Sequence, residues 1–125
     1  VLPPMTKQRS GSIVLISSDT TKNFQPRNAI YGSAKAGLNS FASHLAKEVG
    51  SQDVRINVVS MGITKTPKLM NSCWLTAEMK KSAIERIPLG RLAERGDVVD
   101  AITFLASEHA SFITGQILSV NGGLC

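Results

Sequence analysis

The sequence predicts an α/β fold in which parallel strands are joined by helices, in the order β-α-β-α-α-β. Short β-branched runs with little alternation suit strands that are buried on both faces of a sheet. The segments between them carry apolar residues at helical spacing, and a helix between two strands favours parallel pairing with right-handed crossovers. Sheets of this kind usually have more than three strands. We therefore expect the first strand to leave an apolar edge bare, which is an aggregation liability.

The first half of the chain contains two of these strands and the longest predicted helix. Residues 13–16 read Ile-Val-Leu-Ile and form the first strand, and residues 19–28 read as a loop. A helix is expected from about Ala29 to Val49, where Gly50 ends it. The apolar stripe expected to be buried on this helix consists of Ala34, Leu38, Phe41, Leu45 and Val49. A second strand follows over residues 54–59.

The second half begins with a long irregular segment over residues 61–75, and a loop of this length inside a domain is usually functional or mobile. A helix is expected from Thr76, as its N-cap, to Ile87. Another helix should begin with Asp97 as its cap and run to about Ser107. The last strand covers residues 116–120 and leads into Asn-Gly-Gly.

Composition and charge exclude several classes of protein. The 125 residues suit one domain, and 42% hydrophobic against 18% charged residues is typical of a globular chain. The net charge is +5, but the basic residues are scattered and aromatic residues make up only 5%, so nucleic-acid binding is not expected. No apolar run approaches the ~18 residues of a membrane span. Cys73 and Cys125 fit no metal or redox spacing, so we expect no metal site and a reducing, cytoplasmic location.

Tyr31 and Lys35 stand four residues apart near the start of the long helix, which places both side chains on one face. A free tyrosine exchanges protons poorly at neutral pH, and a nearby ammonium favours the phenolate form. Such a pair can act as a general acid or base. An exposed tyrosine beside a solvated lysine would have the same spacing, so the pair alone leaves both interpretations open.

Ser18 favours the catalytic interpretation. It follows the first strand at the carboxyl end, where open α/β sheets bind ligands, and it precedes Tyr31 by thirteen residues. A hydroxyl at this place can donate to a developing alkoxide, although Ser17 and Ser18 would also serve simply to end a strand. A serine hydrolase is not indicated, because neither His44 nor His109 has an evident role as a base and no Gly-x-Ser-x-Gly motif is present.

With these residues the chain resembles the short-chain dehydrogenases/reductases, and most of all the 3-oxoacyl-[acyl-carrier-protein] reductase-like branch. The likeness covers nearly the whole chain. The matching motifs are Ile16-Ser17-Ser18, Tyr31-Gly32-Ser33-Ala34-Lys35-Ala36-Gly37, Val54-Arg55-Ile56-Asn57-Val58-Val59, Gly90-Arg91-Leu92, Phe104-Leu105-Ala106-Ser107, Phe112-Ile113-Thr114-Gly115-Gln116 and Val120-Asn121-Gly122-Gly123.

The resemblance implies a role for each residue of the catalytic set. Tyr31 would be the general acid in carbonyl reduction, or the base in alcohol oxidation. Lys35 would favour the phenolate of Tyr31 and hydrogen-bond the nicotinamide ribose. Ser18 would orient and polarise the substrate carbonyl.

The resemblance also implies an NADP or NAD cofactor, of which this segment would contact only the nicotinamide end. The implied contacts are Ile16, Ser17, Tyr31, Lys35, Met61, Gly62, Ile63, Thr64 and Thr66. Met61 and Thr64 depart from the family's Pro-Gly-x-Ile-x-Thr pattern, and a proline would have restrained the backbone at position 61. Residues 67–87 resemble the substrate-binding lid, in which Trp74 is a candidate substrate wall or a packing residue of the lid itself.

The expected architecture is therefore the C-terminal portion of a Rossmann-like doubly wound parallel sheet. Residues 1–125 would form a single partial domain that lacks the N-terminal βαβ units and their Gly-rich phosphate turn. The implied partners are a small carbonyl or alcohol substrate and further copies of the chain, as a dimer or tetramer. An alternative is a non-catalytic remnant of an enzyme that keeps the assembly surface of the long helix and last strand.

Overall fold

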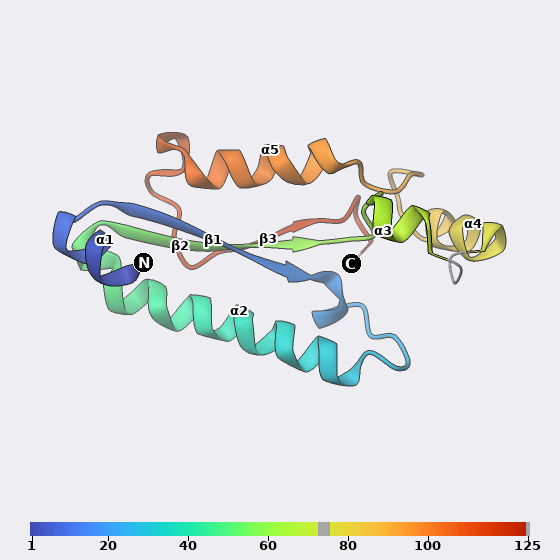
Figure 1. Ribbon diagram of the computed structural model, residues 1–125, viewed down its shortest axis with the longest axis horizontal. Helices are drawn as coiled ribbons and strands as arrows, with labels where there is room; N and C mark the ends of the chain where they lie inside the picture. Colours follow the sequence, from blue (N-terminus) through green and yellow to red (C-terminus); the bar gives the residue numbers. More distant parts are fainter. Residues whose placement is uncertain (73–75, 125) are drawn as a thin grey trace.

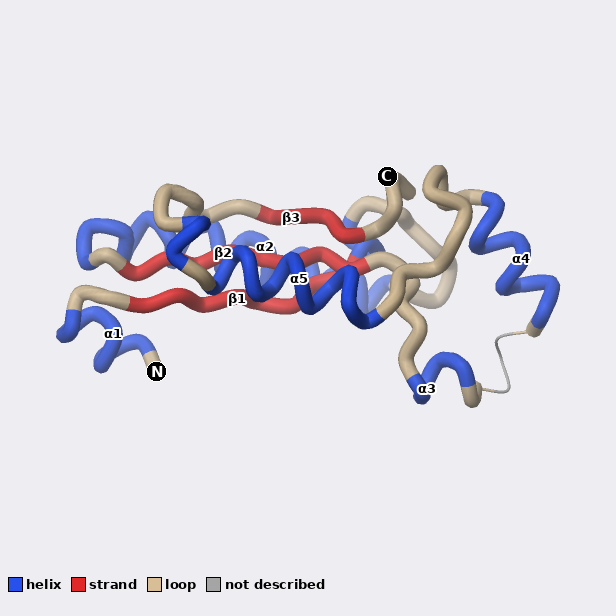
Figure 2. The backbone as a smooth tube through the Cα atoms, turned by 90° about the horizontal axis from the view of Figure 1, so that it is seen from above, coloured by secondary structure: helices blue, strands red, loops and turns tan. Residues whose placement is uncertain are grey.

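A three-stranded parallel sheet runs through the middle of the molecule, in the spatial order β1-β2-β3 (Figure 1). The computed structural model describes residues 1–72 and 76–124. The strands are β1 (Gly11–Ser18), β2 (Val54–Met61) and β3 (Ile117–Val120). Figure 2 shows β2 between its two neighbours. The parallel sheet and the strand–helix order predicted from the sequence are confirmed.

Helices cover both faces of the sheet, as the lack of alternation in the strands predicted. α2 (Ala29–Val49) lies against one face and α5 (Arg95–Ala106) against the other (Figure 1). The shorter elements are α1 (Leu2–Gln8), α3 (Pro67–Met70), α4 (Ala77–Glu85) and the 3-10 turns η1 (Asp19–Thr21), η2 (Gly50–Gln52) and η3 (Glu108–Ala110). α1 and α3 were not predicted, because neither is long enough to show an apolar period. None of the described helices is long and apolar enough to cross a membrane.

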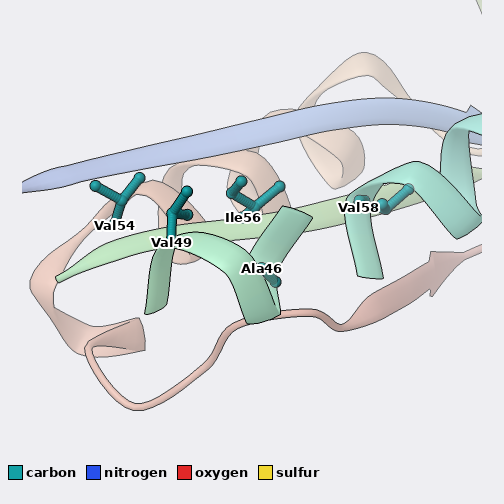
Figure 3. Close-up of a cluster of buried hydrophobic side chains, with 6 residues drawn as sticks. Ala46, Val49, Val54, Ile56 and Val58 are labelled. Carbon is teal, nitrogen blue, oxygen red and sulfur yellow. The ribbon is translucent and has the colours of Figure 1, made fainter. Parts of the chain in front are cut away.

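Two hydrophobic clusters, one on each face of the sheet, form the core. Val54, Ile56 and Val58 of β2 point toward α2, where they pack against Ala46 and Val49 (Figure 3). The alternate side chains of β2 point toward α5, and the second cluster is formed by Val59, Val98, Leu105 and Ala110. Successive side chains of β1 pack alternately against the first and the second cluster, so this strand contributes to the core on both faces of the sheet.

The apolar stripe predicted for α2 was only partly right. Val49 is buried, but Phe41 is 55% exposed. The other fully buried residues are Ala42 and Ala46, each one position after a residue of the predicted stripe, Phe41 and Leu45. α2 has a second apolar stripe, formed by Ile30, Ala34, Gly37 and Phe41, which faces away from the sheet. A single sequence cannot show which of two apolar stripes meets the sheet.

The caps of the last two long helices were predicted with mixed success. Thr76 is the N-cap of α4, as predicted, and its Oγ1 accepts a hydrogen bond from the Met79 N–H at 3.2 Å. Asp97 is not the cap of α5. The N-cap is Glu94, and Asp97 lies one turn inside the helix, where its carboxylate accepts the Glu94 N–H at 2.7 Å. Both ends of this reciprocal arrangement satisfy backbone donors that the first turn leaves unpaired.

β1 is an edge strand, as the sequence predicted, and its register shows which groups face outward. The Val58 N–H donates to the carbonyl of Gln116, the residue just before β3, so the backbone groups of Val59 face β1. Val59 is the partner of Ile16 in the register of the two strands. In a parallel ladder a residue forms hydrogen bonds with the two neighbours of its partner, so Val59 bonds Leu15 and Ser17 and not Ile16 itself. The N–H and C=O groups of Ile16 therefore point to the open edge, together with those of Ser12 and Val14.

Candidate active site

The candidate site lies at the carboxyl end of the sheet, where all three parallel strands end on the same side (Figure 1). β1 leads there into η1 and then into the start of α2. β2 leads into residues 62–66, and β3 into residues 121–124. Ligands of open α/β sheets bind at this end because the connecting loops are free to form a site there.

Ser18 is the last residue of β1 and the N-cap of η1. Its Oγ accepts the Thr20 N–H at 3.3 Å, and its carbonyl accepts the Thr21 hydroxyl at 3.0 Å. The backbone around Ser18 is therefore tied to the turn that follows. Because Oγ is the acceptor in its bond with Thr20, the hydroxyl hydrogen remains able to donate to a further group.

Tyr31 and Lys35 lie in the first two turns of α2, with the Lys35 ammonium 5.8 Å from the centroid of the Tyr31 ring. At this distance a cation is attracted to the face of an aromatic ring. The same ammonium donates to the Ile16 carbonyl at 2.7 Å. Lys35 thus spans from α2 to the open edge of β1, and Tyr31 remains half exposed.

Ser17, which the resemblance assigns to cofactor contact, is buried under α2. Its hydroxyl lies 3.4 Å from the Lys35 carbonyl, to which it donates. This bond joins the end of β1 to the helix turn that carries Lys35. Ser17 therefore contributes to how Lys35 is placed.

The segment after β2 is tightly packed. Met61 pairs with Ser18 on β1 and Val120 on β3, so β2 continues one residue past Ser60 without the proline of the family pattern. The Gly62 N–H donates to the Val120 carbonyl at 3.0 Å. A Cβ at position 62 would lie 2.9 Å from the Asn121 Cα, which leaves room for no side chain.

The other three residues of this segment have different surroundings. Ile63 is 36% exposed. Thr64 is nearly buried, and its hydroxyl donates to the Gly62 carbonyl at 3.1 Å. Thr66 is the N-cap of α3, where its hydroxyl oxygen accepts the Leu69 N–H at 3.2 Å. The hydroxyl groups of both threonines thus hold the local backbone.

A cavity of about 870 Å³ opens beside Ser18. Its floor contains Asp19 and Gly62, and α4 contributes Met79 and Ala83 to one wall. Arg86 stands at the same wall and donates to the Asn23 carboxamide oxygen at 2.9 Å, which links the end of α4 to the loop before α2. Tyr31 and Lys35 are not among the described residues that line this cavity. Trp74, the predicted substrate wall, lies outside the described residues.

Asp19 is the residue at this site that the sequence analysis missed. It is only 4% exposed, and its Oδ1 accepts the Ser60 hydroxyl at 3.4 Å. Burial raises the pKa of Asp19, while hydrogen bonds from Asn121 and Ser60 and the charge of Lys22 act against this rise. An acidic residue directly after a strand at its carboxyl end was the signal that could have identified it.

Comparisons with known proteins identify the family of this chain. Residues 1–125 match the model of a family described as enoyl-(acyl carrier protein) reductase. The 3-oxoacyl-[acyl-carrier-protein] reductase of Chlamydia trachomatis is 40% identical over 124 residues, which are 99% of this chain and 49% of that protein. The chain belongs to the short-chain dehydrogenase/reductase family.

Solved structures of the family extend the match to three dimensions. A 3-oxoacyl-[acyl-carrier protein] reductase of Brucella melitensis superposes with a TM-score of 0.91 at 32% identity, over 98% of this chain and 45% of that one. A structure from the same organism that holds NAD gives a TM-score of 0.87 at 32% identity, over 98% and 44%. The chain thus spans about half the length of the relatives it matches, and the expected partial Rossmann-like fold is confirmed.

Proposed function

We propose that this chain supplies the catalytic residues of an NAD(P)-dependent oxidoreductase that interconverts a carbonyl compound and a secondary alcohol. A 3-oxoacyl thioester is the substrate class we favour, because the Chlamydia trachomatis relative is named for that activity. The Brucella melitensis structure with bound NAD supports a nicotinamide cofactor. The observation that carries the proposal is the placement of Ser18, Tyr31 and Lys35 around the carboxyl end of β1.

The residues present fit the nicotinamide end of such a cofactor. An ammonium has three N–H donors, and Lys35 uses one of them on the Ile16 carbonyl. The others, with the Tyr31 hydroxyl, would hold the ribose hydroxyls. Gly62 lines the cavity that opens beside Ser18. When bound there, the nicotinamide would supply or accept the hydride.

In the proposed reduction, Ser18 donates its hydroxyl hydrogen to the substrate carbonyl oxygen and orients it. Tyr31 gives the proton that the oxygen needs as it becomes an alcohol. The nearby Lys35 ammonium stabilises the phenolate that Tyr31 leaves behind. In the reverse direction Tyr31 takes the proton, and the same positive charge favours that step.

Replacing Tyr31 by Phe tests this assignment, because it removes only the proton-carrying hydroxyl. We expect turnover of acetoacetyl thioester with NADPH to fall by about 10²–10⁴-fold. The assay follows the loss of NADPH absorbance and uses the longest natural polypeptide that contains this sequence. Ser33→Ala, an exposed position on the same helix, is the control and should keep its rate. Turnover near the wild-type level in Tyr31→Phe would refute the mechanism.

A second candidate function is assembly without catalysis, and the outer face of α2 favours it. Ile30 is 88% exposed and Phe41, three helical turns further on, is 55% exposed. Exposed large apolar residues along one helix face are typical of a contact surface. Sedimentation velocity should show dimers or tetramers, and Phe41→Glu should shift them to monomers. Ser40→Glu, beside it on an exposed position, should leave the assembly intact.

A further inference from the structure

Asp19 lies where the ends of all three strands meet. Its Oδ1 accepts a hydrogen bond from Ser60 on β2, and its carboxyl group also interacts with Asn121, which follows β3. On the third side is Gly62, where a Cβ would approach the Asp19 Oδ2 to 3.3 Å. One side chain from the end of β1 is thus in contact with the ends of β2 and β3.

The backbone of Asp19 is engaged as firmly as its side chain. Its carbonyl accepts the N–H groups of Lys22 at 2.9 Å and Asn23 at 2.6 Å. These bonds start the loop that carries the chain from Ser18 toward α2. The residue is therefore fixed to the sheet by its carboxyl group and to the loop by its carbonyl, directly beside the predicted carbonyl-binding serine.

We propose that Asp19 is a positioning residue of the candidate active site, which holds the Ser18 hydroxyl at a fixed place relative to the Gly62 backbone. The proposal has two parts. The effect of Asp19 on catalysis rests on the proposed oxidoreductase function, whereas its effect on the position of the Ser18 hydroxyl does not. The shape and hydrogen-bond acceptors of the carboxyl group do the positioning. Burying the negative charge of this carboxyl group costs free energy. The nearby cation, Lys22, offsets only part of this cost, and its ammonium also donates a hydrogen bond to Ser119 at 3.4 Å.

Two amide hydrogens report directly on this placement. The Thr20 N–H is bonded to the Ser18 Oγ, and the Gly62 N–H to the Val120 carbonyl. The Val58 N–H, in the middle of the sheet, reports on global unfolding. Hydrogen exchange at these three amides, measured by NMR on this chain, separates local loosening at the site from loss of stability throughout.

The experiment compares Asp19→Ala, which removes the carboxyl group, with Asp19→Asn, which keeps its shape and an acceptor. In Asp19→Ala we expect exchange at Thr20 and Gly62 to accelerate about tenfold more than at Val58. Asp19→Asn should restore both rates. Glu48→Ala, an exposed acid on α2, is the control and should change neither. Equal acceleration at all three amides, or none at Thr20, would overturn the proposal.

The catalytic arm uses the same variants in the acetoacetyl thioester assay. Asp19→Ala should lower kcat by about 10- to 100-fold with little change in KM, because misplacing a polarising hydroxyl weakens the transition state more than binding. Asp19→Asn should recover most of the rate. Full kcat in Asp19→Ala would contradict the role in catalysis. If Tyr31→Phe also keeps its rate, the proposed function fails, whereas the exchange measurements still decide the placement.

Discussion

Gly62 occupies a position where the strand ends leave space for a hydrogen atom only. Replacing it by Ala would bring a Cβ within 2.9 Å of backbone at Asn121 and 3.3 Å of the Asp19 carboxylate. We expect Gly62→Ala to lower the free energy of unfolding by about 1–3 kcal/mol, the usual cost of overpacking. Urea denaturation measures the change.

Gly37 provides the matched control for this substitution. It lies inside α2, and a Cβ there would meet nothing within 4 Å. Gly37→Ala should therefore stabilise the chain by about 0.5–1 kcal/mol, because alanine loses less backbone entropy in a helix. A destabilised Gly37→Ala, or an unchanged Gly62→Ala, would contradict this account of the two glycines.

At the same scale, the spacing of Ser18, Tyr31 and Lys35 could be predicted because each is placed by its own element. The helix period alone puts Tyr31 and Lys35 on one face, and Ser18 ends a strand that its β-branched residues make evident. Asp19 could not be understood in this way. Its surroundings depend on Ser60, which lies 41 residues away in the sequence.

At the scale of the element, α5 shows how a helix start is stabilised by charge. Hydrogen bonds from Arg91, with that from the Glu94 N–H, hold the pKa of Asp97 at about 2, below its ordinary value of 3.8. Arg91 contacts both carboxylate oxygens, at 2.6 and 3.0 Å. The folded-state pKa is the lower one, so the charged carboxylate stabilises the fold above pH 3.8. This contribution is lost as the pH falls toward 2.

Asp97→Asn tests this contribution, since it removes the charge and keeps the shape. We expect the variant to have a lower melting temperature than the wild type at neutral pH. The difference should shrink as the pH falls through the window from 3.8 to about 2. Thermal denaturation followed by circular dichroism at several pH values gives the comparison. Asp100→Asn, on the same helix and exposed, should show no such trend.

α2 marks the limit of what helical periodicity predicts. The period located the helix with both ends correct, from Ala29 to Val49. It did not identify the buried face, because apolar residues lie on two stripes and only contact with the sheet distinguishes them. Ala42 and Ala46 allow the helix to approach β2 closely, whereas the larger Phe41 points outward.

At the scale of the whole molecule, the sheet has two edge strands, β1 and β3, and β1 is the longer of the two. The register directs the N–H groups of Ile13, Leu15 and Ser17 to β2, and those of Val14 and Ile16 outward. Hydrogen exchange along β1 should therefore alternate, with fast exchange at Val14 and Ile16 and slow exchange between them. NMR at low protein concentration measures this directly.

The same measurement at high concentration tests whether the edge associates. Unpaired strand edges pair readily with other chains. Protection that appears at Val14 and Ile16 only as concentration rises would show edge-to-edge pairing. Uniform slow exchange along β1 at every concentration would contradict an open edge.

The sequence by itself determined the order of strands and helices, the parallel sheet, the cap of α4 and the spacing of Ser18, Tyr31 and Lys35. All of these follow from local periods and from residue types at element ends, which act over a few neighbouring positions. Only the tertiary structure decided which face of α2 is buried, why position 62 must be glycine and where the Asp19 carboxyl group lies. These features arise where strand ends distant in sequence meet, and their energies come from packing and burial that no local pattern encodes.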